Sequence, residues 1–226
     1  MNYLTRIMRE SPVAARFAPY FIFVLLIYTQ DAVGESGRYW IYLLRTLAGV
    51  CLIWMMRPLV KEMRWAMSWE AVVVGVAVVV MWVFLGDWVR KMHPLEDAKL
   101  WNPFRQFPAE PALAWFFVAV RTLGSTFVVP PLEETFFRSY VNRAVANKNF
   151  EALPLNYFSW PSLLLTAVLF AAVHHPTDWP GAILCAIAYQ WLVIRKNRLG
   201  DAMTAHAITN FLLSVWSVWQ QDWRFW

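Results

Sequence analysis

The segment from residue 130 to residue 138 carries two adjacent carboxylates and an arginine in surroundings that are otherwise apolar. Such charges lose several kcal/mol of hydration energy unless they are paired or serve a function. On a helix, Glu134 and Arg138 lie four residues apart on one face, so we expect them to form an ion pair. Glu133 points about 100° further round the helix and finds no cation among its helix neighbours. An unpaired carboxylate in a dry setting is a candidate general base.

Two further pairs with helical spacing follow downstream. Phe170 and His174 are four residues apart, and so are His206 and Asn210. Each pair lies in or beside an apolar segment, and each presents its side chains on one helix face. Hydrolysis of a peptide bond needs a base for water and hydrogen-bond donors at the developing negative charge. The pattern therefore predicts that a glutamate, two histidines and an asparagine converge inside a helical bundle.

The rest of the chain has the composition of a membrane protein. Of its 226 residues, 59% are hydrophobic and only 15% are charged, well outside the average for soluble domains. The apolar runs approach or reach the length of about 20 residues that crosses a bilayer as a helix. We therefore predict an all-α, polytopic membrane protein with a single domain over residues 1–226. The motif-bearing core is expected at about residues 112–215.

Seven apolar segments and the motif helix give a prediction of seven or eight transmembrane helices. The motif helix is expected as a separate element over about residues 131–147, with Pro131 in its first turn. The residues from 90 to 111 form a polar connection with aromatic anchors, which we expect near the rim of the site. The predicted spans are residues 14–33, 39–59, 71–89, 112–129, 161–175, 181–194 and 201–219.

Basic residues predict the orientation, because cytoplasmic loops carry an excess of lysine and arginine. Six basic residues fall on the side opposite the N-terminus, including Arg90 and Lys91, which argue against the assignment. The majority places the N-terminus in the cytoplasm, and the cluster at residues 195–198 predicts a site cavity that opens there. The residues on the N-terminal side are Arg6, Arg9, Arg16, Arg57, Lys61, Arg64, Arg143, Lys148, Arg195, Lys196 and Arg198.

Together the motifs resemble those of a known family. Glu133-Glu134-x-x-Phe137-Arg138, Phe170-x-x-x-His174 and His206-x-x-x-Asn210 are similar, in that order, to the three motifs of the CAAX prenyl protease (Rce1-type) family. This is the CPBP or Abi family of intramembrane glutamate peptidases. A narrower resemblance is to small prenyl-protease-related proteins of bacteria with an exosortase system. Family members often carry glycine after the motif arginine, where this chain has Ser139, a change expected to alter packing of the next helix.

The resemblance implies a membrane-embedded endopeptidase without a cofactor. In that family pattern Glu133 and His174 would activate water, while His206 and Asn210 would stabilise the oxyanion. Glu134 and Arg138 would hold the helix and tune the local field. The partners would be a membrane-associated protein or peptide substrate and the lipid bilayer of a bacterial inner membrane, with no nucleic acid.

Alternatives remain open at this level. The chain could be a catalytically silent, partner-binding or immunity-type family member, or a transporter whose charges line a pathway. Glu133, His174 and His206 could also ligate a divalent metal ion. His206 and Asn210 could instead form interhelical hydrogen bonds. The complete set of glutamate, histidines and asparagine favours the enzyme.

The sequence also gives predictions for the other polar residues of the apolar segments and for the two cysteines. His175, just before a proline, is expected to cap a helix end, and the ion pair is expected to be structural whichever function holds. Arg45 and Arg121 lie within predicted spans and receive no role. The two cysteines, Cys51 and Cys185, are expected as small core residues without a disulfide.

Overall fold

The structure is a computed structural model that describes residues 3–28, 33–92 and 100–226. Every regular element in these ranges is helical, which confirms the all-α prediction. The α-helices are α1 Tyr3–Glu10, α2 Pro12–Tyr28, α3 Gly34–Met56, α4 Trp69–Met92, α5 Pro103–Gln106, α6 Pro111–Leu123, α7 Val129–Glu134, α8 Asn142–Ala146, α9 Trp160–Ala172, α10 Trp179–Lys196 and α11 Gly200–Gln220.

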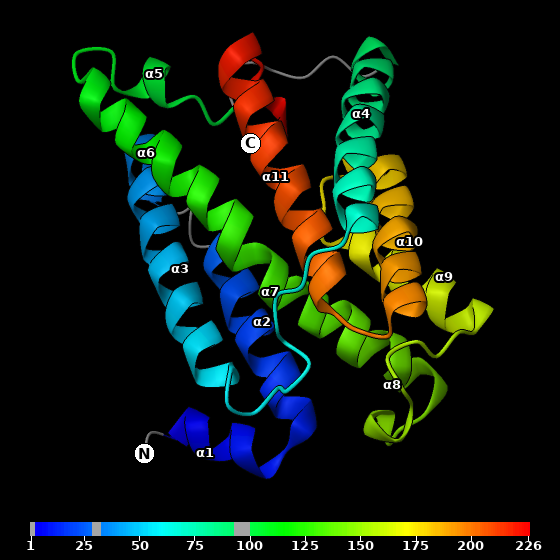
Figure 1. The fold of residues 1–226 in the computed structure, drawn as a ribbon. Helices are drawn as coiled ribbons and strands as arrows, with labels where there is room; N and C mark the ends of the chain where they lie inside the picture. The colour runs from blue at the N-terminus through cyan, green and yellow to red at the C-terminus, as the bar shows by residue number, and fades with distance from the viewer. Residues whose placement is uncertain (1–2, 29–32, 93–99) are drawn as a thin grey trace.

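The helices form one bundle crossed by a long diagonal element (Figure 1). α6, α7 and α8 run as a single oblique path, with α2 and α3 on one side and α4, α10 and α11 on the other. Two π-helical segments, Gly124–Val128 and Thr135–Val141, join the three parts of this path. This path therefore lies between the two groups of helices.

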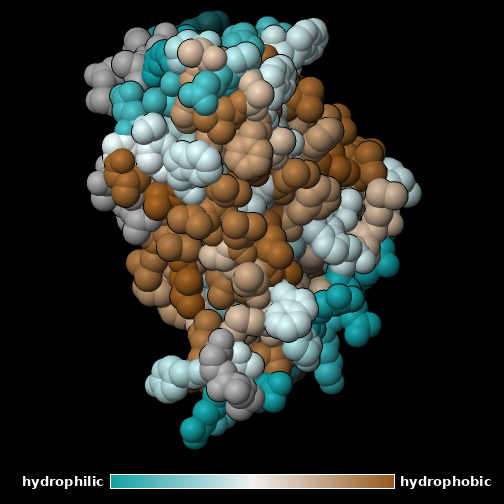
Figure 2. Space-filling model, turned by 90° about the vertical axis from the view of Figure 1, so that its left-hand side faces the viewer, coloured by the Kyte–Doolittle hydropathy of each residue, from teal (hydrophilic) through white to brown (hydrophobic). Residues whose placement is uncertain are grey.

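The length and surface of the helices are those of an integral membrane protein. Among the described residues, three helical stretches are long and apolar enough to cross a membrane: Gly34–Met56, Trp69–Met92 and Pro111–Ala146. Pro12–Ile27 and Trp160–Ala172 are shorter apolar helices. On the face shown in Figure 2, apolar side chains form a broad band between two hydrophilic ends. The predicted count of seven or eight transmembrane helices is not confirmed by these helices.

α11 shows why part of that count lacks a strong hydropathy signal. It carries Asp201, His206 and Thr209, all of which are buried. α11 packs against α4, and a Cβ atom on Gly75 of α4 would lie 2.8 Å from the carbonyl oxygen of Ala205. Such close approach is typical of membrane helices joined at a small residue. The polar residues of α11 thus face the bundle interior rather than lipid.

The motif helix is not a separate element, so that prediction is wrong. Residues 111–146 are helical without interruption, although Pro130 and Pro131 lie inside the run. In an α-helix each proline would clash with the carbonyl four residues earlier. The wider π turn Gly124–Val128 immediately precedes them, and there the N–H of Val129 bonds to the carbonyl of Gly124, five residues back. This local widening accommodates the prolines without ending the helix.

Ser139 joins three helices and a loop at the end of the bundle nearest the N-terminus. Its hydroxyl donates to Glu62 Oε1 at 2.5 Å and accepts from Arg16 Nε at 3.1 Å and Arg143 Nη2 at 2.9 Å. Burial alone raises the pKa of the Glu62 carboxyl, but the Arg16 charge and the Ser139 hydroxyl hold it below its usual value. Ser139 therefore ties these helices and the loop together through hydrogen bonds.

Candidate active site

The Glu134–Arg138 pair is the most deeply buried part of the motif. Arg138 Nε lies 3.2 Å from Glu134 Oε2, and both side chains are 0% exposed. The predicted ion pair is therefore confirmed, across the junction between α7 and the π-helical segment that follows. The guanidinium of Arg138 also lies over the ring of Phe170, 4.5 Å from its centroid. Ion pair and ring together fix this helix against α9.

His206 connects the two motif glutamates. Its Nδ1 donates to Glu134 Oε1 at 2.8 Å, and its Nε2 lies 4.0 Å from Glu133 Oε2. Because an ionised carboxylate can only accept, the contact with Glu134 assigns a proton to Nδ1. The ring of Tyr189 stacks on the imidazole at 5.2 Å and is held by a hydrogen bond from its hydroxyl to Thr209. His206 is thus fixed on one nitrogen and presents the other towards Glu133.

His174 is held at the end of α9 in a defined tautomer. Its Nδ1 lies 2.7 Å from the carbonyl oxygen of Phe170, which is an acceptor only, so Nδ1 carries the proton. Carbonyls in the last turn of a helix lack partners within the helix, and this side chain satisfies one of them. The spacing Phe170-x-x-x-His174 therefore leaves Nε2 free of its proton and able to accept one.

Asn210 is anchored by a carbonyl that the prolines leave unpaired. Its Nδ2 donates to the carbonyl oxygen of Ser125 at 2.9 Å. Within the helix that carbonyl has no donor, because Val129 N–H bonds to Gly124 and Pro130 has no N–H. The hydrogen bond from the Asn210 side chain to Ser125 uses one of the two hydrogens on Nδ2. The second hydrogen remains available to another acceptor. The π turn and the proline thereby position Asn210 beside the motif glutamates.

The candidate residues border a cavity with two lobes of about 280 and 240 Å³. Glu133, His174 and Asn210 line both lobes, and His206 lines the smaller one. Glu134 and Arg138 are absent from the described lining of either lobe. The residues shared by both lobes are Val129, Glu133, His174, Asn210, Leu213, Phe225 and Trp226. The structure therefore brings the predicted base and donors to one space and keeps the ion pair behind it.

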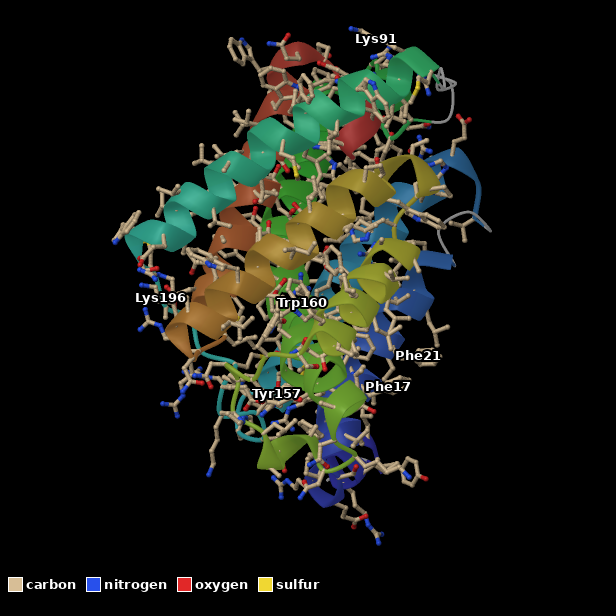
Figure 3. All side chains as sticks on the ribbon, turned by 90° about the vertical axis from the view of Figure 1, so that its right-hand side faces the viewer. Phe17, Phe21, Lys91, Tyr157, Trp160 and Lys196 are labelled. Atoms are coloured by element: carbon tan, nitrogen blue, oxygen red, sulfur yellow. The ribbon has the colours of Figure 1, made fainter. Side chains whose placement is uncertain are left out.

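The cavity lies in the half of the bundle away from the N-terminus. Its lining includes Asp178, at the connection between α9 and α10, and Phe225, in the turn Trp223–Phe225 that follows α11. Figure 1 shows that the end of α10 near this connection lies well below the neighbouring end of α4. Figure 3 shows Lys91 at the opposite end from the N-terminal helix, Tyr157 in the half nearer that helix, and Lys196 about midway between the two ends.

The sequence also predicted that the cavity opens to the cytoplasm, on the side of the basic cluster at residues 195–198, and the side of the membrane on which it opens stays a prediction. Glu134, Phe137 and Arg138, which neighbour Glu133 on the same helical run, are all buried. The sequence places these polar residues in or beside apolar helices. It does not give the side on which a cavity opens, because that depends on how side chains from different helices pack together.

Two arginines that received no role from the sequence also line the larger lobe. Arg45 comes from the middle of α3 and Arg121 from α6. Arg45 is close enough to Glu133 for their charges to interact. The expectation that Glu133 lacks a neighbouring cation holds for its own helix but not for the bundle. An arginine in the middle of an apolar segment was the sequence signal, since such residues are rare in membrane helices and usually functional.

The minor predictions around the site have mixed outcomes. His175 caps the short helix Pro176–Asp178 by accepting from the Thr177 N–H, as predicted. Both cysteines are free; Cys185 is buried as expected, whereas Cys51 is exposed on the bundle surface. Trp101, in the described part of the connection before α6, lies beside Arg121, while residues 93–99 of that connection are outside the described ranges.

Metal ligation by Glu133, His174 and His206 is the alternative that the sequence left open. Among the described residues, no group of three or more histidine, cysteine, aspartate or glutamate side chains could hold a metal ion. The absence of a cofactor remains a prediction.

Comparison with known proteins points to one family. Residues 108–212 match the model of a family described as type II CAAX prenyl endopeptidase Rce1-like. The matched segment begins just before α6 and ends within α11, so it includes every candidate site residue from Glu133 to Asn210. No curated protein sequence and no solved structure matches the chain.

Proposed function

Since residues 108–212 belong to the Rce1-like family of type II CAAX prenyl endopeptidases, we propose that the protein is an intramembrane endopeptidase. Its substrate would be a protein or peptide associated with the membrane. The observation that carries the proposal is the shared cavity, in which a carboxylate, an imidazole and an amide face one space. A family match alone would allow a catalytically silent member, whereas a cavity lined by a potential base and a potential donor favours an enzyme.

In the proposed reaction Glu133 and His174 activate a water molecule. The carboxylate of Glu133 and the unprotonated Nε2 of His174 can each accept a proton from water. The water oxygen would attack the carbonyl carbon of the scissile bond while its proton passes to Glu133. When the carbon–nitrogen bond breaks, Glu133 would return that proton to the leaving amine. No further reagent is needed, because water supplies all the atoms added across the bond.

The oxyanion would be received first by Asn210. Its second Nδ2 hydrogen is available, and the bond to Ser125 fixes the direction of the amide. His206 can donate from Nε2 only as an imidazolium ion, since the Nδ1 proton is already committed to Glu134. The carboxylates of Glu133 and Glu134 are the groups that would stabilise that positive charge. We therefore propose that Asn210 donates a hydrogen bond to the oxyanion whatever the charge of His206. His206 would donate a second hydrogen bond only when its imidazole is protonated on both nitrogens.

Glu134 and Arg138 would act through His206 rather than on the substrate. Glu134 forms an ion pair with Arg138 and accepts a hydrogen bond from His206, so one carboxylate fixes the guanidinium and the imidazole together. Neither Glu134 nor Arg138 lines the cavity. This assigns them a positioning role, in which the ion pair orients His206 and offsets its charge.

The position of the cavity bears on where the substrate is cut. Basic residues concentrate at the end of the bundle that holds the N-terminus, which favours a cytoplasmic location for that end. The cavity lies in the other half, so cleavage would occur in the outer half of the membrane. A bacterial inner membrane is the location that we propose.

Labelling of single cysteines tests the orientation. In a Cys51→Ser background, Glu110→Cys in the connection before α6 should react with a membrane-impermeant maleimide added to intact cells. Asn197→Cys, beside the basic cluster, should react only after the membrane is permeabilised. The opposite pattern would place the cavity in the cytoplasmic half.

The proposed activity is tested by comparing membrane proteins in cells that carry the wild-type chain or Glu133→Gln. We expect one precursor to accumulate in the variant, and the purified wild-type protein in detergent should cleave it. Cleavage should survive chelation and dialysis if no metal takes part, whereas loss that zinc restores would assign the cluster to metal binding. Equal precursor levels in both strains would favour a silent family member or a transporter.

A further inference from the structure

Two arginines inside the bundle have positions that the proposed reaction leaves unused. Arg45 is central in α3, eleven residues from either end, and Arg121 lies near the end of α6. Both line the larger lobe of the cavity together with Glu133 and Asn210. They come from different helices, so the fold rather than one sequence motif brings their charges to the same space.

Neither guanidinium forms an ion pair among the described residues, although the charge of Glu133 is within range of Arg45. No carboxylate in those ranges lies within 4 Å of Arg45 or Arg121, and neither guanidinium makes a hydrogen bond there. The Nε atom of Arg45 is buried without an acceptor. By contrast, Arg138 is paired with Glu134, and Arg16 is paired with Glu62 at 2.7 Å.

Aromatic rings enclose the two cations without using their donors. Arg45 lies over Phe23 at 4.3 Å and Tyr42 at 5.3 Å from the ring centroids. Arg121 lies over Tyr42 at 4.9 Å, and Trp101 and Trp226 complete its surroundings at 4.7 and 5.7 Å. Such contacts favour a cation through the flat faces of its guanidinium. The N–H groups lie in the plane, at the edges, and remain available to an anion.

Burying a charge inside an apolar bundle costs free energy, and such charges are commonly retained where they serve a function. Two cations close to each other also repel, and the structure places Arg45 and Arg121 within range of such an interaction. An anion between them would offset both charges and would supply acceptors for their planar donors. The arrangement therefore has the properties of an empty anion-binding subsite.

We propose that Arg45 and Arg121 bind a carboxylate group of the substrate during peptide hydrolysis, an inference that rests on the proposed function. The subsite shares its lobe with Glu133, so the anion belongs to the same peptide that is cut. Arg121 precedes Glu133 by twelve residues on one helical run, a rise of roughly 18 Å. The side chains close part of that gap, which leaves room for a few extended residues at about 3.3 Å each. The carboxylate is either the C-terminus or a nearby aspartate or glutamate side chain.

Calorimetric titration of the full chain in detergent tests the subsite separately from cleavage. In a Glu133→Gln background, three probes are compared: acetyl-Ala-Val-Ile-Leu as the free acid, the same peptide as its C-terminal amide, and acetyl-Ala-Glu-Ile-Leu-amide. We expect the free acid or the glutamate-containing amide to bind at least tenfold more tightly than the neutral amide. The tighter probe identifies whether the carboxylate is terminal or belongs to a side chain.

Substitution of the arginines should remove this preference. Arg45→Gln and Arg121→Gln should each lower the ratio between acidic and neutral probes towards one, and Arg121→Lys should retain part of it. Arg57→Gln, at the end of the same helix as Arg45, is the matched control and should leave the ratio unchanged. Arg121→Met should melt at the same or a higher temperature, because it removes an unpaired charge, whereas a purely structural arginine would lower the melting temperature when replaced.

The outcomes separate the subsite from the proposed peptidase. No difference between acidic and neutral probes, either in heat or in melting temperature, would overturn the subsite even if a precursor accumulates in Glu133→Gln cells. Preference that survives in both glutamine variants would also overturn it. A preference that depends on Arg45 and Arg121, without any precursor in cells, would support the anion site and contradict the peptidase.

Discussion

Glu133 and Glu134 are consecutive residues, yet their surroundings differ in every respect that matters for function. Glu134 is fully buried, accepts from His206 and pairs with Arg138. The side chain of Glu133 is 15% exposed and lines both lobes of the cavity, and its Oε2 lies 4.0 Å from Nε2 of His206. The two side chains differ by about 100° in direction on the helix. One carboxylate is directed into the packed bundle and the other into open space.

The buried arginines also fall into two groups, those paired with a carboxylate and those that face the cavity. Arg138 and Arg16 have carboxylate partners, whereas Arg45 and Arg121 face the cavity with aromatic neighbours. A paired buried charge mainly determines which conformation is stable, because loss of one partner leaves the other uncompensated. A charge that faces a cavity remains available to a ligand or to a proton. The comparison predicts that substitutions in the paired set lower stability and substitutions in the cavity set lower activity or binding.

The largest effect is expected for Glu133→Gln in the hydrolytic reaction. Loss of a general base typically costs about 10²–10⁴-fold in rate, and the isosteric amide should leave the fold intact. The rate of cleavage of the accumulated precursor by purified protein measures this effect. Glu110→Gln, on the exposed connection before α6, is the control. Full activity of Glu133→Gln would exclude Glu133 as the base.

Glu134→Gln should act mainly on stability. Arg138 would remain buried without its partner, at a cost of about 3–5 kcal/mol in the free energy of unfolding. Unfolding in mixed micelles with increasing denaturing detergent measures the loss. The double variant Glu134→Gln/Arg138→Met should recover part of it, because no uncompensated charge remains. Unchanged unfolding of the single variant would contradict the role of the pair.

Asn210→Ala is expected to reduce turnover by about 10²–10³-fold, the effect of removing one oxyanion donor in a well-studied hydrolase. The same change leaves the Ser125 carbonyl without its partner, so stability should fall by about 1–3 kcal/mol. Ser214→Ala, one turn further along α11, is the matched control for a cavity-lining residue. A kcat equal to that of the control would show that Asn210 serves only to hold α11 against the π turn.

The smallest effect concerns Glu62 and pH. Its carboxyl has a pKa below the usual value in the folded protein, so its contribution to stability is present above the unfolded pKa of about 4.3. That contribution is lost as pH falls through the lower, folded pKa. Between pH 6 and pH 3 the wild-type protein should therefore lose more unfolding free energy than Glu62→Gln.

Ser139→Ala provides a second check on the same cluster and should lower stability by about 1–2 kcal/mol at neutral pH, through loss of hydrogen bonds to charged groups. Glu10→Gln, in the exposed pair with Arg6, is the control with little expected effect. Identical pH profiles for wild type and Glu62→Gln would contradict the assignment.

The sequence predicted the features that depend on local spacing. Apolar runs gave the helical class, and i, i+4 spacing gave the Glu134–Arg138 pair and the Phe170–His174 contact. These relations are contained within one helix, so residue number determines them. The order of the three motifs also predicted the family that residues 108–212 match.

The features that the sequence did not predict depend on contacts between helices. The π turn before Pro130 has no residue signature, so two prolines predicted a helix start where the chain continues. Tyr189 gave no signal within its apolar segment, although it stacks on His206. The two arginines that line the larger lobe, Arg45 and Arg121, come from different helices and gave no sign of a shared cavity. Spacing along one helix cannot specify how different helices pack together.

The most direct test of the comparison is the unfolding free energy of Glu133→Gln and Glu134→Gln, measured side by side in the same detergent. The two substitutions are chemically identical and affect adjacent residues, so only their surroundings differ. We predict that Glu133→Gln is as stable as the wild-type protein, or more so, while Glu134→Gln loses about 3–5 kcal/mol. Equal losses for both variants, or a larger loss for Glu133→Gln, would contradict the division between charges that hold the bundle and charges that face the cavity.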